Sequence, residues 1–247
     1  MWQKKVREFF WSCFFLPNGV CPICGKVLFR TRSFLCALCF EDLLTIEMQT
    51  CRYCGKPLFT ETLPFCGDCG KLEDPIFSGG FAWLHYNDAG KQLVHGLKFG
   101  NKPHLGIWMG QEMAVRLGQF EWIWEIDAII PVPLYFKRQE ERGYNQSEKL
   151  AKGIQEGLRS VSIDLPVWCD TVMRCRDTPH QMGLNRKERF ENLKGAFVVA
   201  EPDAIRGKKL LLVDDVNTTG TTLRACADTL KKAGARAVFV ATCAGVQ

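Results

Sequence analysis

The sequence has no apolar run long enough to cross a membrane. Near its start, residues 9–16 are largely apolar but number only eight and run into Pro17, whereas a membrane-spanning helix needs about 20 residues. Lys4, Lys5 and Arg7 give this stretch a faint likeness to an export signal, but no small-x-small cleavage site follows. We therefore expect a cytoplasmic protein without a transmembrane segment, in which residues 9–16 form a short helix packed on the protein itself or on a partner.

An excess of charge of one sign is also missing. The net charge is only +5 over 247 residues, and residues 1–79 hold nine Lys and Arg against eight Asp and Glu. A clustered basic face would be the electrostatic signature of nucleic-acid binding. The composition therefore permits an anionic ligand without indicating DNA. Apolar and charged fractions of 47% and 24% are typical of a globular protein.

Cysteine is abundant, in contrast, and its placement is regular. Eight of the thirteen cysteines form Cys-x2-Cys pairs before residue 70. Each of two units has a pair, eleven residues and another pair, and the second unit repeats the first thirty residues later. Four thiolates complete a tetrahedral zinc site. We predict two structural Zn²⁺ ions with these ligands: Cys21, Cys24, Cys36, Cys39, Cys51, Cys54, Cys66 and Cys69.

Several alternatives remain open for these cysteines. Disulfides or a redox-active Cys-x-x-Cys compete with zinc, but cysteine pairs in a reducing compartment favour metal binding. The four pairs can be used sequentially or interleaved, and the spacing favours two sequential ribbons. Such ribbons either contact nucleic acid or protein or serve only as a structural cap, and the sequence does not separate these roles.

The composition changes after residues 71–75, where the cysteine pairs stop. We place a domain boundary there, with an N-terminal helix and double zinc ribbon in residues 1–79 and a second domain in residues 80–247. In the second domain we expect a strand at 81–86, helices at 89–98 and 104–118, and a buried strand at 127–133. Short strands are also expected near 171–173 and 196–199.

The most specific stretch of the chain is residues 209–224. Leu210 to Val213 form a short apolar run, as in a strand buried on both faces of a parallel sheet. A turn of small hydroxyl-bearing residues follows, and then apolar residues recur at helical spacing. The backbone N–H groups of such a turn and the positive end of the helix dipole form an anion site. No Gly-Lys-Ser/Thr follows, so this is not a Walker loop.

Two carboxylates distinguish this site from a simple phosphate-binding turn. Asp214 and Asp215 stand between the apolar run and the turn. Carboxylates accept hydrogen bonds from vicinal ribose hydroxyls or hold a metal ion that shields phosphate charge. A sugar with a phosphate at one end therefore fits better than a bare phosphate. An ordinary strand, turn and helix with solvated acids is the alternative.

Two further segments bear positive charge next to predicted strand ends. Prolines end the strand at 127–133, and Lys137, Arg138 and Arg142 follow it. Residues 174–194 hold six Lys and Arg against three Asp and Glu. A loop with such cations can close over a site, exclude water and neutralise a departing anion. Solvated surface loops are the alternative for both segments.

Taken together, these motifs resemble the ComF/GntX family, in which a double zinc ribbon precedes a phosphoribosyltransferase-like domain. The likeness covers nearly the whole chain, and residues 209–224 resemble the 5-phosphoribosyl-1-pyrophosphate (PRPP) motif of type I phosphoribosyltransferases. It implies an α/β fold, with a parallel sheet flanked by helices. It also implies a link to natural competence, the uptake of external DNA.

The resemblance further implies roles for individual residues. Asp214 and Asp215 would bind the ribose as catalytic carboxylates, with Mg²⁺ accompanying PRPP. The 5-phosphate loop would comprise Val216, Asn217, Thr218, Thr219, Gly220, Thr221 and Thr222. The pyrophosphate would meet Pro131, Val132, Pro133, Leu134, Arg138 and Arg142, and Lys98 and Arg176 would also bind PRPP.

The acceptor of the phosphoribosyl group is not marked by any residue pattern, and no cysteine nucleophile indicates a fused glutaminase. Two functions from different classes therefore stand side by side. One is a phosphoribosyltransferase. The other is a non-catalytic module regulated by PRPP or a nucleotide, whose ribbons contact single-stranded DNA or a helicase or recombination protein of DNA uptake.

Overall fold

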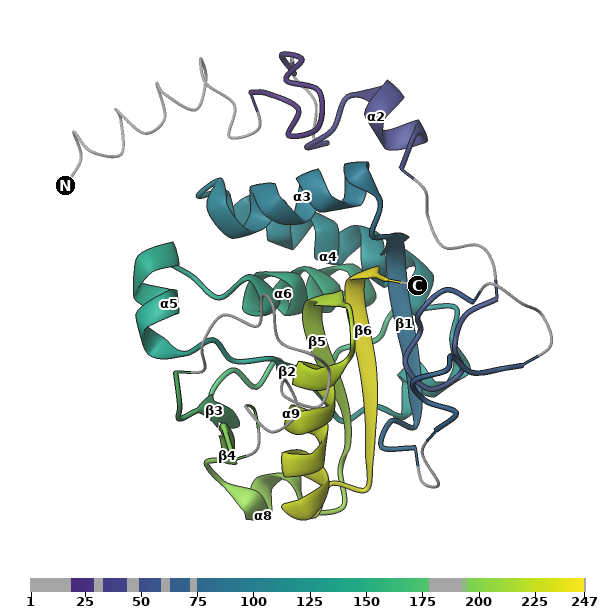
Figure 1. Ribbon diagram of the computed structural model, residues 1–247, viewed down its shortest axis with the longest axis vertical. Helices are drawn as coiled ribbons and strands as arrows, with labels where there is room; N and C mark the ends of the chain where they lie inside the picture. The colour runs from purple at the N-terminus through teal and green to yellow at the C-terminus, as the bar shows by residue number, and fades with distance from the viewer. Residues whose placement is uncertain are drawn as a thin grey trace.

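The centre of the fold is a four-stranded parallel sheet in the order β1-β6-β5-β2 (Figure 1). The computed structural model describes residues 19–28, 33–43, 49–58, 63–71, 75–177, 193 and 195–246. The strands of the sheet are β1 (Gly79–His85), β2 (Ala128–Pro131), β5 (Lys209–Asn217) and β6 (Ala237–Gly245). A separate antiparallel pair consists of β3 (Val172–Arg174) and β4 (Phe197–Val199). The predicted α/β fold with a parallel sheet is confirmed.

Helices cover both faces of this sheet. The described helices are α2 (Ala37–Glu41), α3 (Asp88–Phe99), α4 (Pro103–Leu117), the 3-10 helix η1 (Glu121–Glu125), α5 (Phe136–Arg142), α6 (Gln146–Arg159), α8 (Pro202–Ile205) and α9 (Thr221–Lys232). Leu211 and Val213 of β5 pack with α3, α4 and α6 on one face. Leu210 and Leu212, one position out of phase, pack with α9 on the other face. This alternation follows from the two-residue period of a strand.

Helices α4 and α6 approach each other unusually closely, because glycines line their contact. A Cβ atom added at Gly153 of α6 would lie 2.0 Å from the carbonyl oxygen of Ile107, and one added at Gly110 of α4 would lie 2.2 Å from the carbonyl oxygen of Leu150. The two backbones therefore touch directly. This contact fixes the position of α6, whose first turn reaches the carboxyl ends of β2 and β5.

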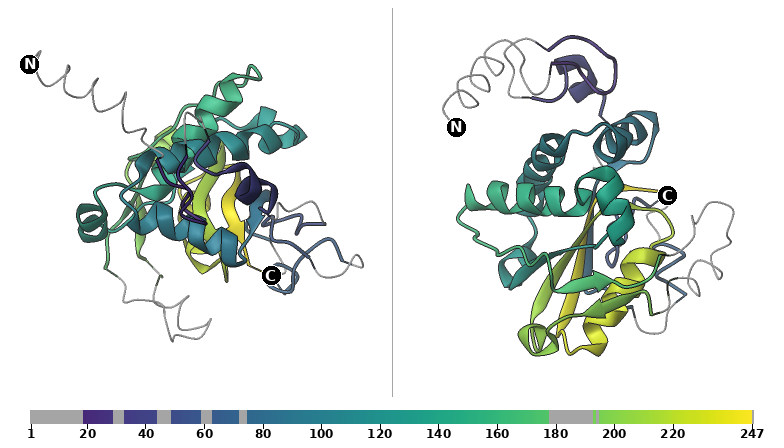
Figure 2. Two further views of the ribbon diagram at one scale, coloured as in Figure 1. Left: turned by 90° about the horizontal axis from the view of Figure 1, so that it is seen from above. Right: turned by 90° about the vertical axis from the view of Figure 1, so that its left-hand side faces the viewer.

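The two cysteine units join different apolar clusters, one on each side of the sheet. Leu28, Phe34 and Leu35 of the first unit join the core on the side of α4, with Trp108. Leu58 of the second unit joins the core on the side of α9. Figure 1 accordingly shows the first unit above α3 and the second beside β1, and the two views of Figure 2 keep them apart.

Several predicted helices and strands are present, with slightly shifted bounds. The strand expected at 81–86 is β1, and α3 begins after Asn87, whose side chain accepts a hydrogen bond from the N–H of Gly90 at 2.9 Å. The helix expected at 104–118 is α4. No helix within the described ranges is long and apolar enough to cross a bilayer. The helix expected at residues 9–16 lies outside the described residues.

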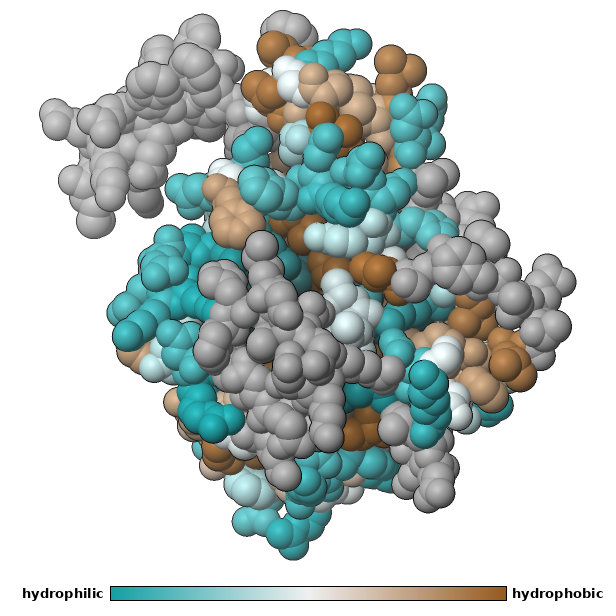
Figure 3. All heavy atoms as spheres, viewed as in Figure 1, coloured by the Kyte–Doolittle hydropathy of each residue, from teal (hydrophilic) through white to brown (hydrophobic). Residues whose placement is uncertain are grey.

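The surface near the first cysteine unit is more apolar than most of the view in Figure 3. Its exposed apolar side chains are Val20, Val27, Leu38 and Phe40. A cavity of about 700 Å³ is lined by Lys26, Val27, Leu28, Ser33, Leu35, Cys36, Ala37 and Phe40 of the first unit and by Trp108, Gln111 and Glu112 of α4. This cavity lies between the first unit and α4.

Candidate functional site

The predicted carboxylates lie on β5, which is longer than expected. We predicted that this strand ends at Val213, but it continues to Asn217 because β6 stays paired with it as far as Gly245. On the other side of β5, β2 ends its pairing at Pro131, opposite Val213. One edge of β5 is therefore open from Asp214 onward. Ligands of open α/β sheets bind beyond the carboxyl ends of the strands, and Asp214 and Asp215 stand there.

Asp214 is held by the first turn of α6. The hydroxyl of Ser147 donates a hydrogen bond to Asp214 Oδ1 at 2.9 Å, and the N–H of Asp215 donates to the same oxygen at 2.9 Å. Asn145 caps α6 and also donates from Nδ2 to the carbonyl oxygen of Val132 at 3.0 Å. The carboxylate, the helix start and the segment after β2 thus form one connected network.

This network leaves Asp214 in an environment that disfavours its charge. Burial, and next the negative charge of Asp215, raise the pKa of Asp214 to about 7, while Lys98 and the hydrogen-bond donors act in the opposite direction. Ionisable groups with strongly shifted pKa values concentrate at functional sites. Asp214 therefore changes its protonation near neutral pH.

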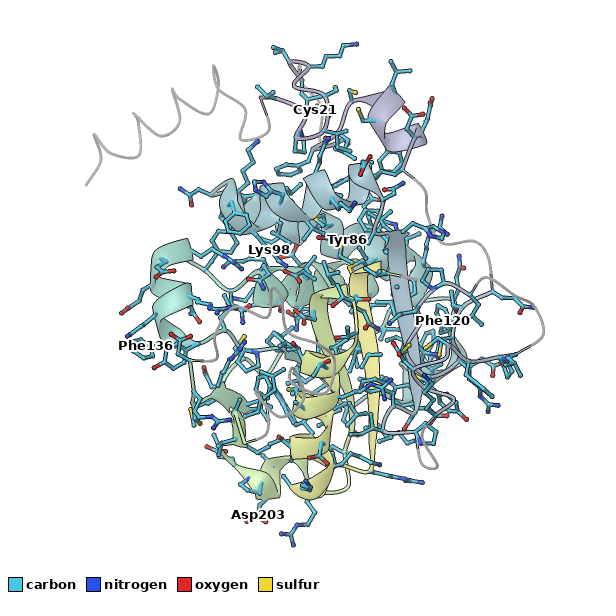
Figure 4. All side chains as sticks on the ribbon, in the orientation of Figure 1. Cys21, Tyr86, Lys98, Phe120, Phe136 and Asp203 are labelled. Atoms are coloured by element: carbon cyan, nitrogen blue, oxygen red, sulfur yellow. The ribbon has the colours of Figure 1, made fainter. Side chains whose placement is uncertain are left out.

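Asp215 points toward α3, where it meets a lysine. Lys98 Nζ lies 2.9 Å from Asp215 Oδ2, and Figure 4 labels Lys98 on this side of the sheet. Burial lowers the pKa of Lys98, but the carboxylates of Asp215 and Asp214 outweigh burial, so its pKa lies above the ordinary value. The ammonium group stays charged and compensates the acid pair.

Arg142 adds a second cation next to Lys98. It lies at the end of α5, donates a hydrogen bond to Gln146 Oε1, and places its guanidinium carbon 5.4 Å from the ring centre of Phe99. Burial lowers the pKa of Arg142, and the charge of Asp215 opposes this shift. These contacts hold the guanidinium beside the acid pair.

The loop after β5 leads directly into the start of α9, as predicted. Gly220 has a φ of 71°, in the left-handed region that favours glycine, and no side chain caps α9. The N–H groups of the first helical turn have no partners within their own helix. Thr219 Oγ1 and Thr221 Oγ1 lie 2.7 Å apart and add hydroxyls on the same side. The loop therefore presents several donors for an anion.

The predicted pyrophosphate segment begins where β2 ends. The N–H of Val132 donates to the carbonyl oxygen of Val213 at 2.9 Å, so this segment leaves the sheet next to Asp214. Pro131 and Pro133 are buried and Leu134 is half-buried. Beside α5, a pocket of about 600 Å³ is lined by Lys98, Phe99, Asn101, Arg138, Glu140, Glu141, Arg142 and Gly143. Its cations suit an extended anion, although the two glutamates weaken its field.

The third predicted segment is described only as far as residue 177. Arg174 ends β3 and places its guanidinium carbon 5.7 Å from the ring centre of Phe197. Burial, and next the charge of Arg138, lower the pKa of Arg174, while Asp214 opposes the shift. Arg174 is therefore electrostatically linked to the acid pair. Arg176 is exposed two residues later, and the predictions for residues 178–192 lie outside the described residues.

Each cysteine unit gathers four thiols at one point, in the sequential arrangement. Cys21, Cys24, Cys36 and Cys39 form one cluster, and Cys51, Cys54, Cys66 and Cys69 form the other, each with all sulfur atoms within 4.8 Å. One sulfur pair in each cluster is 3.7 Å apart, namely Cys24 with Cys36 and Cys54 with Cys66. A tetrahedron with Zn–S bonds of about 2.3 Å has edges of about 3.8 Å. Both clusters therefore fit a structural zinc ion.

Sequence reasoning missed the residues that support the site. Ser147, which holds Asp214, follows the Gly-Tyr-Asn-Gln run but was not assigned a role. Arg174 was included only in a basic loop, and Arg224 was seen only as part of the helix after the loop. Their positions depend on contacts between segments that are far apart in the sequence, such as Ser147 with Asp214 and Arg224 with Cys69, and no local spacing signals such contacts.

Two family models match the chain. A double zinc ribbon domain matches residues 12–70, and a phosphoribosyl transferase domain matches residues 177–246. Competence protein F of Haemophilus influenzae is 41% identical over 115 residues, which cover 46% of this chain and 48% of that protein. The DNA utilization protein YhgH of Escherichia coli K12 is 32% identical over 152 residues, which cover 60% of this chain and 63% of that protein.

The chain is similar in sequence to competence protein F over about half of the length of each protein. The matched region spans less than two thirds of the length of either relative. Among solved structures, the glutamine PRPP amidotransferase from B. subtilis, complexed with ADP and GMP, is 19% identical. The superposition covers 61% of this chain and 30% of the amidotransferase chain, with a TM-score of 0.40. This likeness is too weak to support an argument.

The two family matches cover only part of the candidate site in this chain. Both cysteine clusters fall within the zinc-ribbon match, and β5, the loop and α9 fall within the phosphoribosyl transferase match. Lys98, Pro131 and Ser147 lie between the two matches. Their place beside the acid pair rests on the geometry described above.

Proposed function

We propose that this protein binds PRPP with Mg²⁺ at the open end of β5 and belongs functionally to the phosphoribosyltransferases. One observation carries the proposal: a buried, cation-compensated acid pair lies immediately before an uncapped helix start. The acid pair suits the hydroxyls of a sugar, and the helix start suits its phosphate. The phosphoribosyl transferase match over residues 177–246 supports the same assignment.

In this proposal, different segments hold different parts of PRPP. The N–H groups and hydroxyls of residues 217–222 bind the 5-phosphate, and Asp214 and Asp215 accept hydrogen bonds from the ribose hydroxyls. The segment at residues 131–134, with Arg138 and Arg142, meets the pyrophosphate. Mg²⁺ supplies charge neutralisation when bound with PRPP, and carboxylates are among the ligands it prefers.

The proposed reaction is transfer of the phosphoribosyl group to an acceptor. The bond between C1 of the ribose and a pyrophosphate oxygen breaks, the electron pair leaves with pyrophosphate, and the acceptor forms a bond to C1. The sugar gains positive character while negative charge builds up on the leaving group. Asp214 and Asp215 stabilise the former, and Lys98 and Arg142 lie where they counter the latter. Positioning and charge complementarity would supply most of the catalysis.

The protonation of Asp214 makes binding depend on pH. Only the ionised carboxylate accepts hydrogen bonds with both oxygens. Since burial raises the pKa of Asp214 to about 7, binding should strengthen as the pH rises from about 6 to 8. A rise of this kind would be absent from a site with an ordinary aspartate.

Calorimetry with PRPP and Mg²⁺ tests the proposal. The wild type should bind, and the double variant Asp214→Asn/Asp215→Asn should lose most of its affinity. Asp203→Asn is the matched control, because Asp203 is exposed on α8, far from Lys98 in Figure 4. Wild-type binding no tighter than that of the double variant would overturn the proposal. Pyrophosphate release in a screen of acceptors would then identify the reaction.

The second candidate is a non-catalytic adaptor in DNA uptake. The names of the relatives favour it, since one is a competence protein and the other a DNA utilization protein. In this case PRPP or a nucleotide regulates the protein, and the zinc ribbons contact single-stranded DNA or a helicase or recombination protein. Salt-dependent oligonucleotide binding that persists in the aspartate double variant, with no pyrophosphate release from any acceptor, would favour the adaptor.

A further inference from the structure

The second cysteine cluster is bonded to both ends of the phosphate loop. Asn217 Nδ2, at the start of the loop, donates to the carbonyl oxygen of Cys54 at 3.2 Å. Arg224 Nη2, one turn into α9, donates to Cys69 Sγ at 3.3 Å. Asn217 and Arg224 flank residues 218–222, so the loop is anchored at both ends to residues of one metal cluster.

The backbone of the second unit packs closely against β1 at two glycines. A Cβ added at Gly55 would lie 2.4 Å from the backbone nitrogen of Phe81, and one added at Gly80 would lie 2.5 Å from the carbonyl carbon of Cys54. The turn that bears Cys54 therefore lies directly on β1. Thr218 and Thr219 also share a pocket of about 550 Å³ with Lys56 and other residues of the second unit.

Arg224 makes the contact sensitive to the charge of the cluster. Its side chain is buried, and its guanidinium carbon lies 5.6 Å from the ring centre of Phe77. Within the described ranges, Arg224 forms no ion pair with a carboxylate. The sulfur of Cys69, once it is a thiolate, is therefore the group that can balance its charge. A neutral thiol is a weak acceptor, and a buried cation without an anion is strongly unfavourable. Four thiolates around one Zn²⁺ have a net charge of −2, which satisfies Arg224.

Two other polar atoms of Asn217 and Arg224 lie beside the loop. Asn217 Oδ1 and Arg224 Nε are buried and have no hydrogen-bond partner in the described part of the chain. Both lie beside Gly220, because a Cβ added there would be 3.3 Å from Asn217 Oδ1 and 3.5 Å from Arg224 Nε. The left-handed turn at Gly220 is therefore enclosed by the same two residues that contact the cluster.

We propose that the second zinc site holds residues 218–222 in their anion-binding conformation, with Asn217 and Arg224 as positioning residues. Zinc at Cys51, Cys54, Cys66 and Cys69 and a ligand in the loop then stabilise each other. Coupling of this kind is reciprocal. This inference rests on the proposed function for the identity of the ligand, PRPP, but not for the link between the loop and zinc. The first cluster, on the opposite face beside Trp108, has no such role.

Zinc release tests the link without any sugar phosphate. Transfer of zinc to a chelating dye is followed in full-length Cys39→Ser protein, in which the second site is intact, and in Cys69→Ser protein, in which the first site is intact. Adding Arg224→Met should speed release from the second site by about tenfold, a common size for coupled sites, and leave the first site unchanged. Arg224→Lys, which keeps the charge, should lie between. Equal release with and without Arg224→Met at the second site would overturn the inference.

Affinity for PRPP and Mg²⁺ tests the consequence for the ligand. Cys39→Ser and Cys69→Ser each remove one ligand at equivalent places in the repeat, so they are matched. Cys69→Ser and Arg224→Met should weaken binding by about tenfold, and Cys39→Ser should not. Circular dichroism shows whether each variant retains the α/β domain, and Arg224→Met keeps all eight cysteines. Equal affinities of Arg224→Met and wild type would overturn the coupling. Absence of PRPP binding by the wild type would instead refute the proposed function and leave the zinc-release result standing.

Discussion

The raised pKa of Asp214 predicts that Asp214→Asn stabilises the free protein above neutral pH. Its pKa rises from an ordinary value of 3.8 to about 7 because folding buries the carboxyl beside Asp215. Between these two values the folded state keeps a proton that the unfolded state releases. The free energy of unfolding therefore falls as the pH increases through this range. Asparagine has no charge to bury and keeps an oxygen that can accept the hydrogen bond from Ser147.

The shift sets an upper limit on the effect. Three pKa units correspond to about 4 kcal/mol at pH 8, and local rearrangement around Lys98 reduces this. We expect a gain of at least about 1 kcal/mol at pH 8, which raises Tm by about 2–4 °C for a chain of this size. The gain should shrink toward zero as the pH falls to about 4.5, where wild-type Asp214 is protonated.

Thermal unfolding of both proteins from pH 4.5 to 8.5, without PRPP or Mg²⁺, measures this difference. Zinc and its pH dependence are common to the two proteins and cancel. Asp127→Asn is the control with opposite sign. Burial raises the pKa of Asp127, but hydrogen bonds from the N–H of Lys209 and from Lys208 Nζ outweigh burial, so the pKa is lowered. Asp127→Asn should therefore lose stability above about pH 4, the ordinary aspartate pKa. The reasoning is refuted if Asp214→Asn is no more stable than wild type at pH 8.

Three further predictions follow from other parts of the molecule. Gly153→Ala should cost about 2 kcal/mol or more in urea unfolding, because its Cβ would meet Ile107, whereas Gly67→Ala has open space and should stay within about 0.5 kcal/mol. Lys98→Met removes the cation that lowers the pKa of Asp214, so calorimetry should show the pH midpoint for PRPP binding move upward. Metal analysis should find about two zinc ions per chain, the number expected for eight thiolates in four-coordinate sites.

The two cysteine clusters and the strand, turn and helix of residues 209–224 could be predicted because their sequence patterns are local. Cys21 and Cys24 reach one ion because three residues of chain bring two thiols to one side of a turn. The loop after β5 is equally local, since an apolar strand, a glycine with positive φ and a helix start follow one another within 16 residues, 209–224. Even there, the end of the strand was wrong. Pairing with β6 extends β5 to Asn217, and the partner strand is not visible in the local pattern.

Residues that act across the fold could not be predicted in the same way. Ser147 reaches Asp214 because the glycine contact between α4 and α6 fixes the position of α6. Lys98 meets Asp215 because α3 covers the same end of the sheet. These distances depend on the packing of whole elements, which short-range spacing does not encode.

What the sequence by itself determined is therefore the local pattern of each segment: eight cysteines in two sets of four, two adjacent acids, and a turn of hydroxyl-bearing residues before a helix. The tertiary structure decided which segments work together. It joins two cysteine units of the same spacing to different apolar clusters and, among the described residues, brings the second unit to Asn217 and Arg224. The physical reason is that the covalent chain sets the spacing of the cysteines within each unit. Which part of the protein each unit contacts depends instead on where its apolar side chains are buried.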